Sequence, residues 1–100
     1  MSTKPVYTFA KWQVKEGHLE TVLKLLAEVA AATRKEKGNL FYKIHQGNTD
    51  ANTLLLYEGY IDTAAVEEHR NADYFQKIVV GGIVPNLESR EVVLASELGV

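Results

Sequence analysis

The chain has 100 residues, a formal net charge of -2, 46% hydrophobic residues and no cysteine. This length fits a single domain over residues 1–100, and the near-balanced charge excludes the basic surface of a nucleic-acid-binding protein. The lack of cysteine excludes a disulfide framework, a thiolate nucleophile and a cysteine-ligated metal site.

The first two predicted elements are a strand and a helix. Residues 6–14 alternate between one face with Val6, Thr8, Ala10, Trp12 and Val14 and another with Tyr7, Phe9, Lys11 and Gln13. Residues 18–36 change to helical spacing, which predicts an amphipathic helix. Its apolar stripe contains Leu19, Val22, Leu23, Leu26, Val29, Ala30 and Thr33. Gly38 is the candidate left-handed cap that ends this helix.

The second half of the chain predicts three strands and two helical stretches. Strands are expected at residues 39–46 and 53–61, joined as a hairpin by the turn-forming residues 47–52. Asp62 is a candidate N-cap for a short helix that runs to about residue 70. A second helical stretch carries Tyr74, Phe75, Ile78 and Val79. We expect Gly81, Gly82 and Pro85 to end it, as a simple turn or a flexible lid, before a last strand at residues 89–98.

The predicted order β-α-β-β-α-β is that of the α+β, ferredoxin-like fold, a four-stranded antiparallel sheet with helices on one face. Large apolar residues nevertheless occupy both faces of the sheet. Leu54 and Leu56 share one face of the third strand, whereas Leu55, Tyr57 and Ile61 share the other. Because two helices cover only one face, we expect a homodimer formed through the open sheet face. The alternative is that some of these residues occupy edge or rim positions.

An ordered set of residues carries a resemblance to a known family. The set is Gly38, Leu40, Tyr42, Glu58, Tyr60, Ala65, Val66, His69, Tyr74 and Phe75. In this order and on this topology, it resembles the antibiotic biosynthesis monooxygenase (ABM) family. The resemblance implies a single ABM-like domain, a dimeric α+β barrel, and oxygenation of quinols or polycyclic phenols without a cofactor.

Two other branches of that family bear on the function. The segment 57–66 looks like the branch that isomerises the phosphorylated autoinducer-2 dione. The haem-degrading branch uses an Asn, a Trp and a His ligand, and the matching positions here hold Ala10, Tyr60 and Val79. Haem degradation is therefore not expected. Tyr74 stands where many members have another His, which removes one possible acid–base group.

His69 and Glu58 are the candidate catalytic residues. His69 lies four residues after Ala65, on the same helix face, and an imidazole with a pKa near neutrality accepts a proton from a phenol or a hydroxy-ketone. The alternative is that His69 stabilises the helix C-terminus. Glu58 lies on an otherwise apolar strand face, so it is either functional or a structural partner, for example of Arg70 or Arg90.

Aromatic residues are the candidate substrate-binding groups: Tyr60, Tyr42, Tyr74, Phe75 and Trp12. They would line a pocket for a flat aromatic substrate, or pack in the core, which is the simpler interpretation for Trp12 and Phe75. His18 is expected in solvent and His45 on the open sheet face. Neither a metal-binding spacing of histidines nor a GxGxxG motif is present, so no metal or cofactor is expected.

The sequence therefore predicts a cofactor-independent monooxygenase that acts on a small aromatic or quinol-type substrate with dioxygen. One alternative is isomerisation of a phosphorylated hydroxy-ketone, for which Lys11, Lys43, Arg70 and Lys77 are candidate phosphate anchors. The other is a dimeric small-ligand-binding protein without activity. No apolar stretch is long enough to span a membrane. No long apolar stretch follows residues 1–5, so we expect no signal peptide and a cytoplasmic location.

Overall fold

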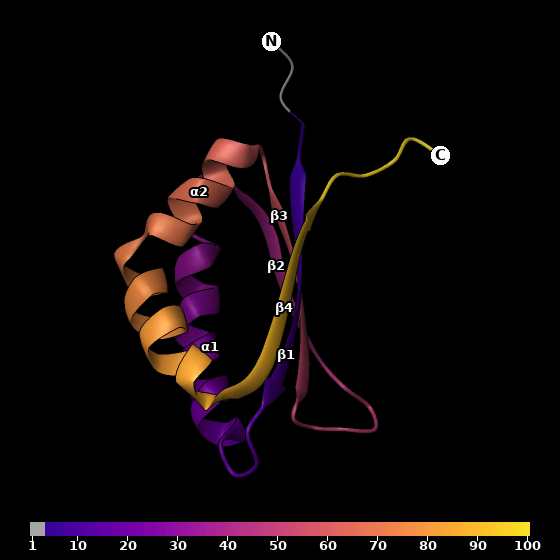
Figure 1. The fold of residues 1–100 in the computed structure, drawn as a ribbon. Coiled ribbons are helices and arrows are strands. Elements are labelled where there is room, and N and C mark those ends of the chain that lie inside the picture. Colours follow the sequence, from indigo (N-terminus) through magenta and orange to yellow (C-terminus); the bar gives the residue numbers. More distant parts are fainter. Residues whose placement is uncertain (1–3) are drawn as a thin grey trace.

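The computed structural model describes residues 4–100. Residues 1–3, on which part of the expectation about a signal peptide depends, lie outside the described residues. The elements are β1 (Val6–Val14), α1 (Leu19–Thr33), β2 (Asn39–Gln46), β3 (Thr53–Tyr60), α2 (Thr63–Asn71), the π-helix η1 (Phe75–Ile83), the 3-10 turn η2 (Val84–Asn86) and β4 (Leu87–Ala95). The strands pair antiparallel in the order β2-β3-β1-β4, and the helices cover one face of the sheet (Figure 1). The predicted ferredoxin-like fold is therefore confirmed.

The covered face of the sheet follows from strand alternation. Thr8, Ala10, Trp12 and Val14 of β1 are all buried, and so are Leu54, Leu56, Glu58 and Tyr60 of β3. The two strands pair so that Ala10 lies opposite Leu56 and Trp12 opposite Leu54. Both rows therefore face the helices, and the predicted alternation along these two strands is confirmed.

Helix α1 packs on this face through Val22, Leu26, Val29, Ala30 and Thr33, which are all buried. Leu23, which the sequence analysis placed in this stripe, is 40% exposed, and Leu25 packs against the core instead. The helix also ends at Thr33 rather than at residue 36, with Arg34 as its C-cap. The last predicted turn is instead a non-helical connection that carries Glu36.

The predicted left-handed cap at Gly38 is wrong. Among the described residues Gly17 alone has a positive φ, of 82°. Gly38 is needed for close packing, because a Cβ at this position would lie 2.5 Å from the Ala65 Cβ of α2. Its carbonyl also accepts a hydrogen bond from Ile61 N at 2.9 Å. Gly38 therefore lets α2 approach the start of β2.

The region after β3 departs partly from prediction. The Asp62 side chain accepts a hydrogen bond from Ala65 N at 2.8 Å, which confirms the N-cap of α2. Gly81 and Gly82 lie inside η1 and do not end it; the chain turns toward β4 only through η2. This last strand begins at residue 87 and ends at residue 95, earlier than the predicted 89–98.

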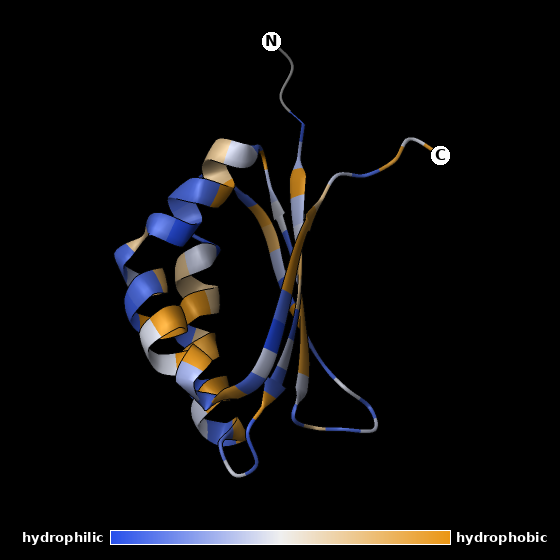
Figure 2. Cartoon of the chain, viewed as in Figure 1, coloured by the Kyte–Doolittle hydropathy of each residue, from blue (hydrophilic) through white to orange (hydrophobic). Residues whose placement is uncertain are grey.

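The outer face of the sheet carries a cluster of apolar side chains that nothing in this chain covers, beside the charged residues Lys11, Lys43 and Glu91. The rings of Phe9 and Tyr57 stack with centroids 4.9 Å apart, and Tyr57 meets Phe41 edge-on at 4.7 Å. Phe9, Leu55 and Val93 on this face are 47%, 44% and 58% exposed. The apolar run near the end of β4 is coloured as hydrophobic along its length in Figure 2. We call Tyr7, Phe9, Phe41, Leu55, Tyr57 and Val93 the outer patch.

No helix in the described part of the chain is long and apolar enough to cross a membrane.

Candidate functional site

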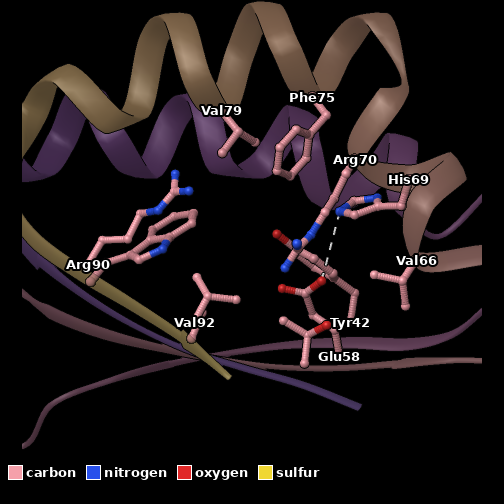
Figure 3. Close-up of a pocket in the computed structure, with 12 residues that line it drawn as sticks. Tyr42, Glu58, Val66, His69, Arg70, Phe75, Val79, Arg90 and Val92 are labelled. Carbon is pink, nitrogen blue, oxygen red and sulfur yellow. Dashed lines mark ion pairs between the residues drawn. The ribbon is translucent and has the colours of Figure 1, made fainter. Parts of the chain in front are cut away.

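A cavity of about 280 Å³ opens between the inner face of the sheet and the helices (Figure 3). Such a volume lies just below the usual range for small-molecule sites. Its walls come from β1, β2, β3, α2, η1 and β4. The lining residues are Thr8, Ala10, Trp12, Tyr42, Glu58, Val66, His69, Arg70, Phe75, Val79, Arg90 and Val92.

Strand pairing places Glu58 at the floor of the cavity. On the central strand β3, Glu58 lies between Thr8 of β1 and Tyr42 of β2. Its side chain is 6% exposed. The Tyr60 hydroxyl donates a hydrogen bond of 2.5 Å to Glu58 Oε1. Tyr60, two residues along the same strand, therefore fixes the orientation of the Glu58 carboxyl in the cavity.

Helix α2 brings His69 over Glu58. Ala65, Val66 and His69 form the buried face of this helix, whose start is fixed by the Asp62 cap. His69 Nε2 lies 3.9 Å from Glu58 Oε1, as the dashed line in Figure 3 marks. The imidazole is only 4% exposed and packs edge-on against Phe75, with centroids 5.0 Å apart. It therefore forms part of the cavity wall.

The other nitrogen of His69 faces a second polar group. Nδ1 lies 3.1 Å from a Glu36 carboxylate oxygen and 3.1 Å from the Tyr74 hydroxyl. The Tyr74 hydroxyl itself donates a short hydrogen bond to Glu36 and lies 3.1 Å from Thr33 Oγ1. Because a carboxylate only accepts, the proton of a neutral imidazole lies on Nδ1 and the Nε2 lone pair is directed to the cavity side.

Burial sets the proton affinities of the acid and the base. It raises the pKa of the Glu58 carboxyl to about 7, although the Tyr60 hydrogen bond and the charge of Arg70 oppose this. Burial lowers the pKa of His69, against the opposing effect of the Glu36 carboxylate. Near neutral pH the site therefore holds a neutral imidazole beside a carboxyl that is poised between its two forms.

The structure brings together most of the residues that the sequence analysis named. Trp12, Tyr42, Glu58, His69 and Phe75 all line the cavity. Tyr60 is fully buried behind Glu58, and Tyr74 lies on the far side of His69, so neither forms the cavity wall. Burial raises the pKa of both tyrosines above the ordinary value.

Other parts of the site were missed or differ. Glu36 was not singled out, since nothing in its local sequence separates it from the other charges near the end of α1. The hypothesis that Arg70 or Arg90 pairs with Glu58 finds no support, because among the described residues neither forms an ion pair. His18 is exposed, and His45 lies on the outer face opposite Leu55, as predicted. No group of three or more metal-ligating side chains occurs in residues 4–100.

The fold and the cavity define a small α+β protein with a buried acid–base pair in a pocket that has both apolar and polar walls. The ABM family model, described as antibiotic biosynthesis monooxygenase, matches residues 5–80. The chain therefore belongs to this family, as the sequence resemblance predicted.

Solved structures share this fold. A protein from Pseudomonas aeruginosa is similar with a TM-score of 0.90 and 26% identity, covering 99% of this chain and 99% of that chain. A conserved protein from Methanosarcina mazei Go1 gives a TM-score of 0.90 at 22% identity, covering 96% and 95%. A structure described as an antibiotic biosynthesis monooxygenase is similar with a TM-score of 0.88 and 24% identity, covering 93% of this chain and 98% of that chain. The sequence finds no match among the curated proteins.

Proposed function

We propose that this protein is a cofactor-independent monooxygenase that oxidises a phenol or quinol with dioxygen. The observation that carries the proposal is His69, a buried imidazole that lies in the cavity wall between two carboxyl groups. Membership of the ABM family supports the same class of reaction. The chemistry then needs a base, a desolvated aromatic substrate and access for dioxygen.

His69 is the proposed base. With its Nδ1 proton donated to Glu36, its Nε2 is free to accept the proton of a substrate hydroxyl in the cavity. The imidazolium that forms is stabilised by the Glu36 carboxylate on the opposite side of the ring. Burial lowers the pKa of His69, so the base is neutral and available near neutral pH. Glu36 acts through His69 and is a positioning residue.

Glu58 is proposed to assist at the floor of the cavity. Its pKa of about 7 lets it hold a proton or release one at neutral pH, next to the position of the substrate hydroxyl. Tyr60, which donates to Glu58, fixes the orientation of that carboxyl from behind. The sequence analysis proposed that Tyr60 positions the substrate directly; its burial favours this indirect role instead.

The oxidation step balances without another reductant. The phenolate transfers one electron to dioxygen, which gives a phenoxyl radical and superoxide. These combine by forming a carbon–oxygen bond at a ring carbon that carries hydrogen. Loss of that ring proton and cleavage of the oxygen–oxygen bond, with protonation of the leaving oxygen, give a quinone and one water. The proton that His69 removed is available for that leaving oxygen.

The apolar walls support this chemistry. Trp12, Phe75 and Val79 lie around the cavity, and a flat ring bound against them is removed from water. The Tyr42 side chain, on the cavity floor beside Glu58, is proposed to orient the substrate oxygen. Desolvation of the phenolate raises its energy relative to water and favours electron transfer.

We also propose that two copies of the chain associate through the outer patch. Its aromatic rings contact one another, by stacking or edge-on, and three of its apolar side chains remain more than 40% exposed. Soluble monomers rarely leave such a continuous apolar surface in water. A two-fold axis over the sheet would cover this surface in both copies.

Oxygen uptake tests the function. Wild-type protein with metal chelator present is mixed with 1-naphthol or with 1,4-dihydroxynaphthalene, and oxygen consumption and quinone formation are followed together. We expect equal amounts of oxygen consumed and quinone formed, and the loss of both in His69→Gln. The proposal fails if no phenol or quinol gives turnover above the uncatalysed rate. Isomerisation of a phosphorylated hydroxy-ketone without oxygen consumption would assign the protein to the other branch instead.

A further inference from the structure

Two arginines at the cavity are left without a role by the proposed oxidation. Arg70 follows His69 on α2, and Arg90 lies opposite Trp12 in the pairing of β4 with β1. Both line the same 280 Å³ cavity. Figure 3 shows the two side chains entering this space from different walls, Arg70 from the helix and Arg90 from the edge strand.

Neither guanidinium forms an ion pair within the described chain, although the charge of Arg70 acts on Glu58. The ion pairs of residues 4–100 involve Lys24 and His69 only, and no carboxylate lies within 4.0 Å of either arginine. Neither side chain donates a hydrogen bond to another group in the same residues. Glu58, the carboxyl on the cavity floor, keeps a raised pKa of about 7 despite the charge of Arg70. Two guanidinium groups of solvent-exposed residues therefore border a cavity whose lining carboxyl, Glu58, is partly protonated near neutral pH.

Each arginine also has a structural explanation. Inward-pointing charges on edge strands discourage pairing with other sheets, and β4 is an edge strand, which accounts for Arg90. Arg70 lies in the last turn of α2, where a cation is favourable. Neither explanation accounts for the fact that both arginines line one cavity. A guanidinium presents a planar fork of donors that matches a carboxylate or a phosphate.

We propose that Arg70 and Arg90 form an anion subsite for a carboxylate or phosphate group carried by the substrate. The inference rests on the proposed function in one respect: it takes the cavity as the substrate site. The ring of the substrate then lies against Trp12 and Phe75, its hydroxyl points to His69, and its anionic group lies at the arginines. The substrate class narrows from phenols in general to acidic phenols.

Calorimetric binding tests the subsite independently of turnover. The matched probes are 1-naphthol and 1-hydroxy-2-naphthoate, which differ in one carboxylate. We expect the carboxylate probe to bind about tenfold more tightly, the effect of a charge-assisted hydrogen bond at a partly exposed site. Its advantage should shrink as salt is added. Equal affinity of the two probes would overturn the proposal.

Variants locate the effect. Arg70→Gln and Arg90→Gln should each weaken binding of the carboxylate probe about tenfold and change binding of 1-naphthol less than twofold. Lys77→Gln is the control, because it removes the same charge from an exposed residue of η1 that does not line the cavity. If Lys77→Gln weakens binding as much as the arginine variants, the effect is one of overall charge and the subsite is wrong.

The same experiment separates the two proposals. Arginine-dependent binding of 1-hydroxy-2-naphthoate without oxygen uptake would keep the subsite and contradict the monooxygenase. Oxygen uptake with 1-naphthol, together with carboxylate binding that does not depend on the arginines, would support the monooxygenase and contradict the subsite. A third probe, dihydroxyacetone phosphate, distinguishes the source of the anion. If only this probe depends on the arginines, the subsite binds a phosphate ester and the substrate is not an acidic phenol.

Discussion

The inner and outer faces of the sheet both carry tyrosines, but their surroundings differ. On the inner face, Tyr42 and Tyr60 are buried around a single carboxyl, Glu58. On the outer face, Tyr7 and Tyr57 stack with phenylalanines at the surface. The two sets of tyrosines differ in burial and in the polarity of their neighbours. They lie on the same sheet because successive residues of a strand point to opposite faces.

This contrast underlies the two roles that we propose for the sheet in a chain of 100 residues. The inner face has a small cavity with titratable groups, which suits one small substrate. The outer face carries the exposed outer patch, which is the surface we propose for contact with a second copy of the chain. Changes to the first face should alter chemistry and pH dependence, whereas changes to the second should alter assembly. Each prediction below tests that separation.

Replacing His69 should produce the largest effect. His69→Gln keeps a polar side chain but removes the proposed base, so kcat/KM for oxidation should fall by about 10² to 10⁴. His18→Gln is the matched control, because His18 is exposed at the start of α1 and far from the cavity lining. Stopped-flow oxygen consumption measures both. Activity of His69→Gln within a few-fold of the wild type would show that another group is the base.

Replacing Glu58 should stabilise the fold while damaging the site. The pKa of Glu58 is raised from 4.5 to about 7 in the folded protein. Between these two pH values the unfolded chain has lost this proton and the folded chain has kept it, so stability falls as pH rises from 4.5 to about 7. Glu58→Gln removes this titration and keeps an oxygen for the Tyr60 hydroxyl. At about pH 8 its free energy of unfolding should exceed that of the wild type by about 3 kcal/mol, and the gain should vanish by about pH 4.

Urea denaturation at several pH values measures this difference, with Glu28→Gln on the exposed side of α1 as control. The variant also reveals the opposite contribution of His69. A lowered pKa means that the unfolded state binds more protons, so stability is lost as pH falls through about 6.5 toward the folded pKa. A Glu58→Gln variant less stable than the wild type at high pH would contradict the assigned burial effect.

Strand alternation made the sheet predictable, and it also predicted the site residues that the strands contribute. Trp12, Glu58 and Leu56 face inward because their parity along β1 and β3 is fixed, and the bounds of β1 and β2 match the prediction. His69 was predictable from its spacing to Ala65 on a capped helix. These residues follow local periodicity, which a single sequence contains.

The contacts between distant segments were not predictable. Glu36 reaches His69 from a connection after α1, 33 residues away, so no local pattern indicates it. Gly38 looked like a helix cap, yet its role depends on Ala65 of α2, which packs against it only in the folded chain. Gly81 and Gly82 looked like a break because glycine is a poor helix former, but both lie inside η1, where a Cβ at Gly82 would come within 3.2 Å of Leu25 of α1. Each error arises where tertiary contact overrides local preference.

Charging the outer patch should change assembly and leave the inner site intact. Val93→Lys places a charge on an edge-strand residue that is 58% exposed, so the fold should tolerate it. We expect the dimer dissociation constant to rise about a hundredfold, because a lysine would be buried against a second apolar patch. Val80→Lys, an exposed apolar residue of η1, is the control. Light scattering measures the mass of each protein in solution. A wild-type mass equal to that of one chain would refute the dimer.

Removing the charge of Glu36 should give the smallest effect, and its signature is a pH shift. Glu36 raises the pKa of His69, so Glu36→Gln should lower that pKa further and move the acidic limb of the pH–rate profile to lower pH. The maximal rate should fall about tenfold, because the imidazolium loses its stabilising partner. A role of Glu36 in folding alone would lower the amount of active protein without moving the limb. An unshifted profile would therefore remove Glu36 from the mechanism, and the inner face would then act through His69 and Glu58 alone.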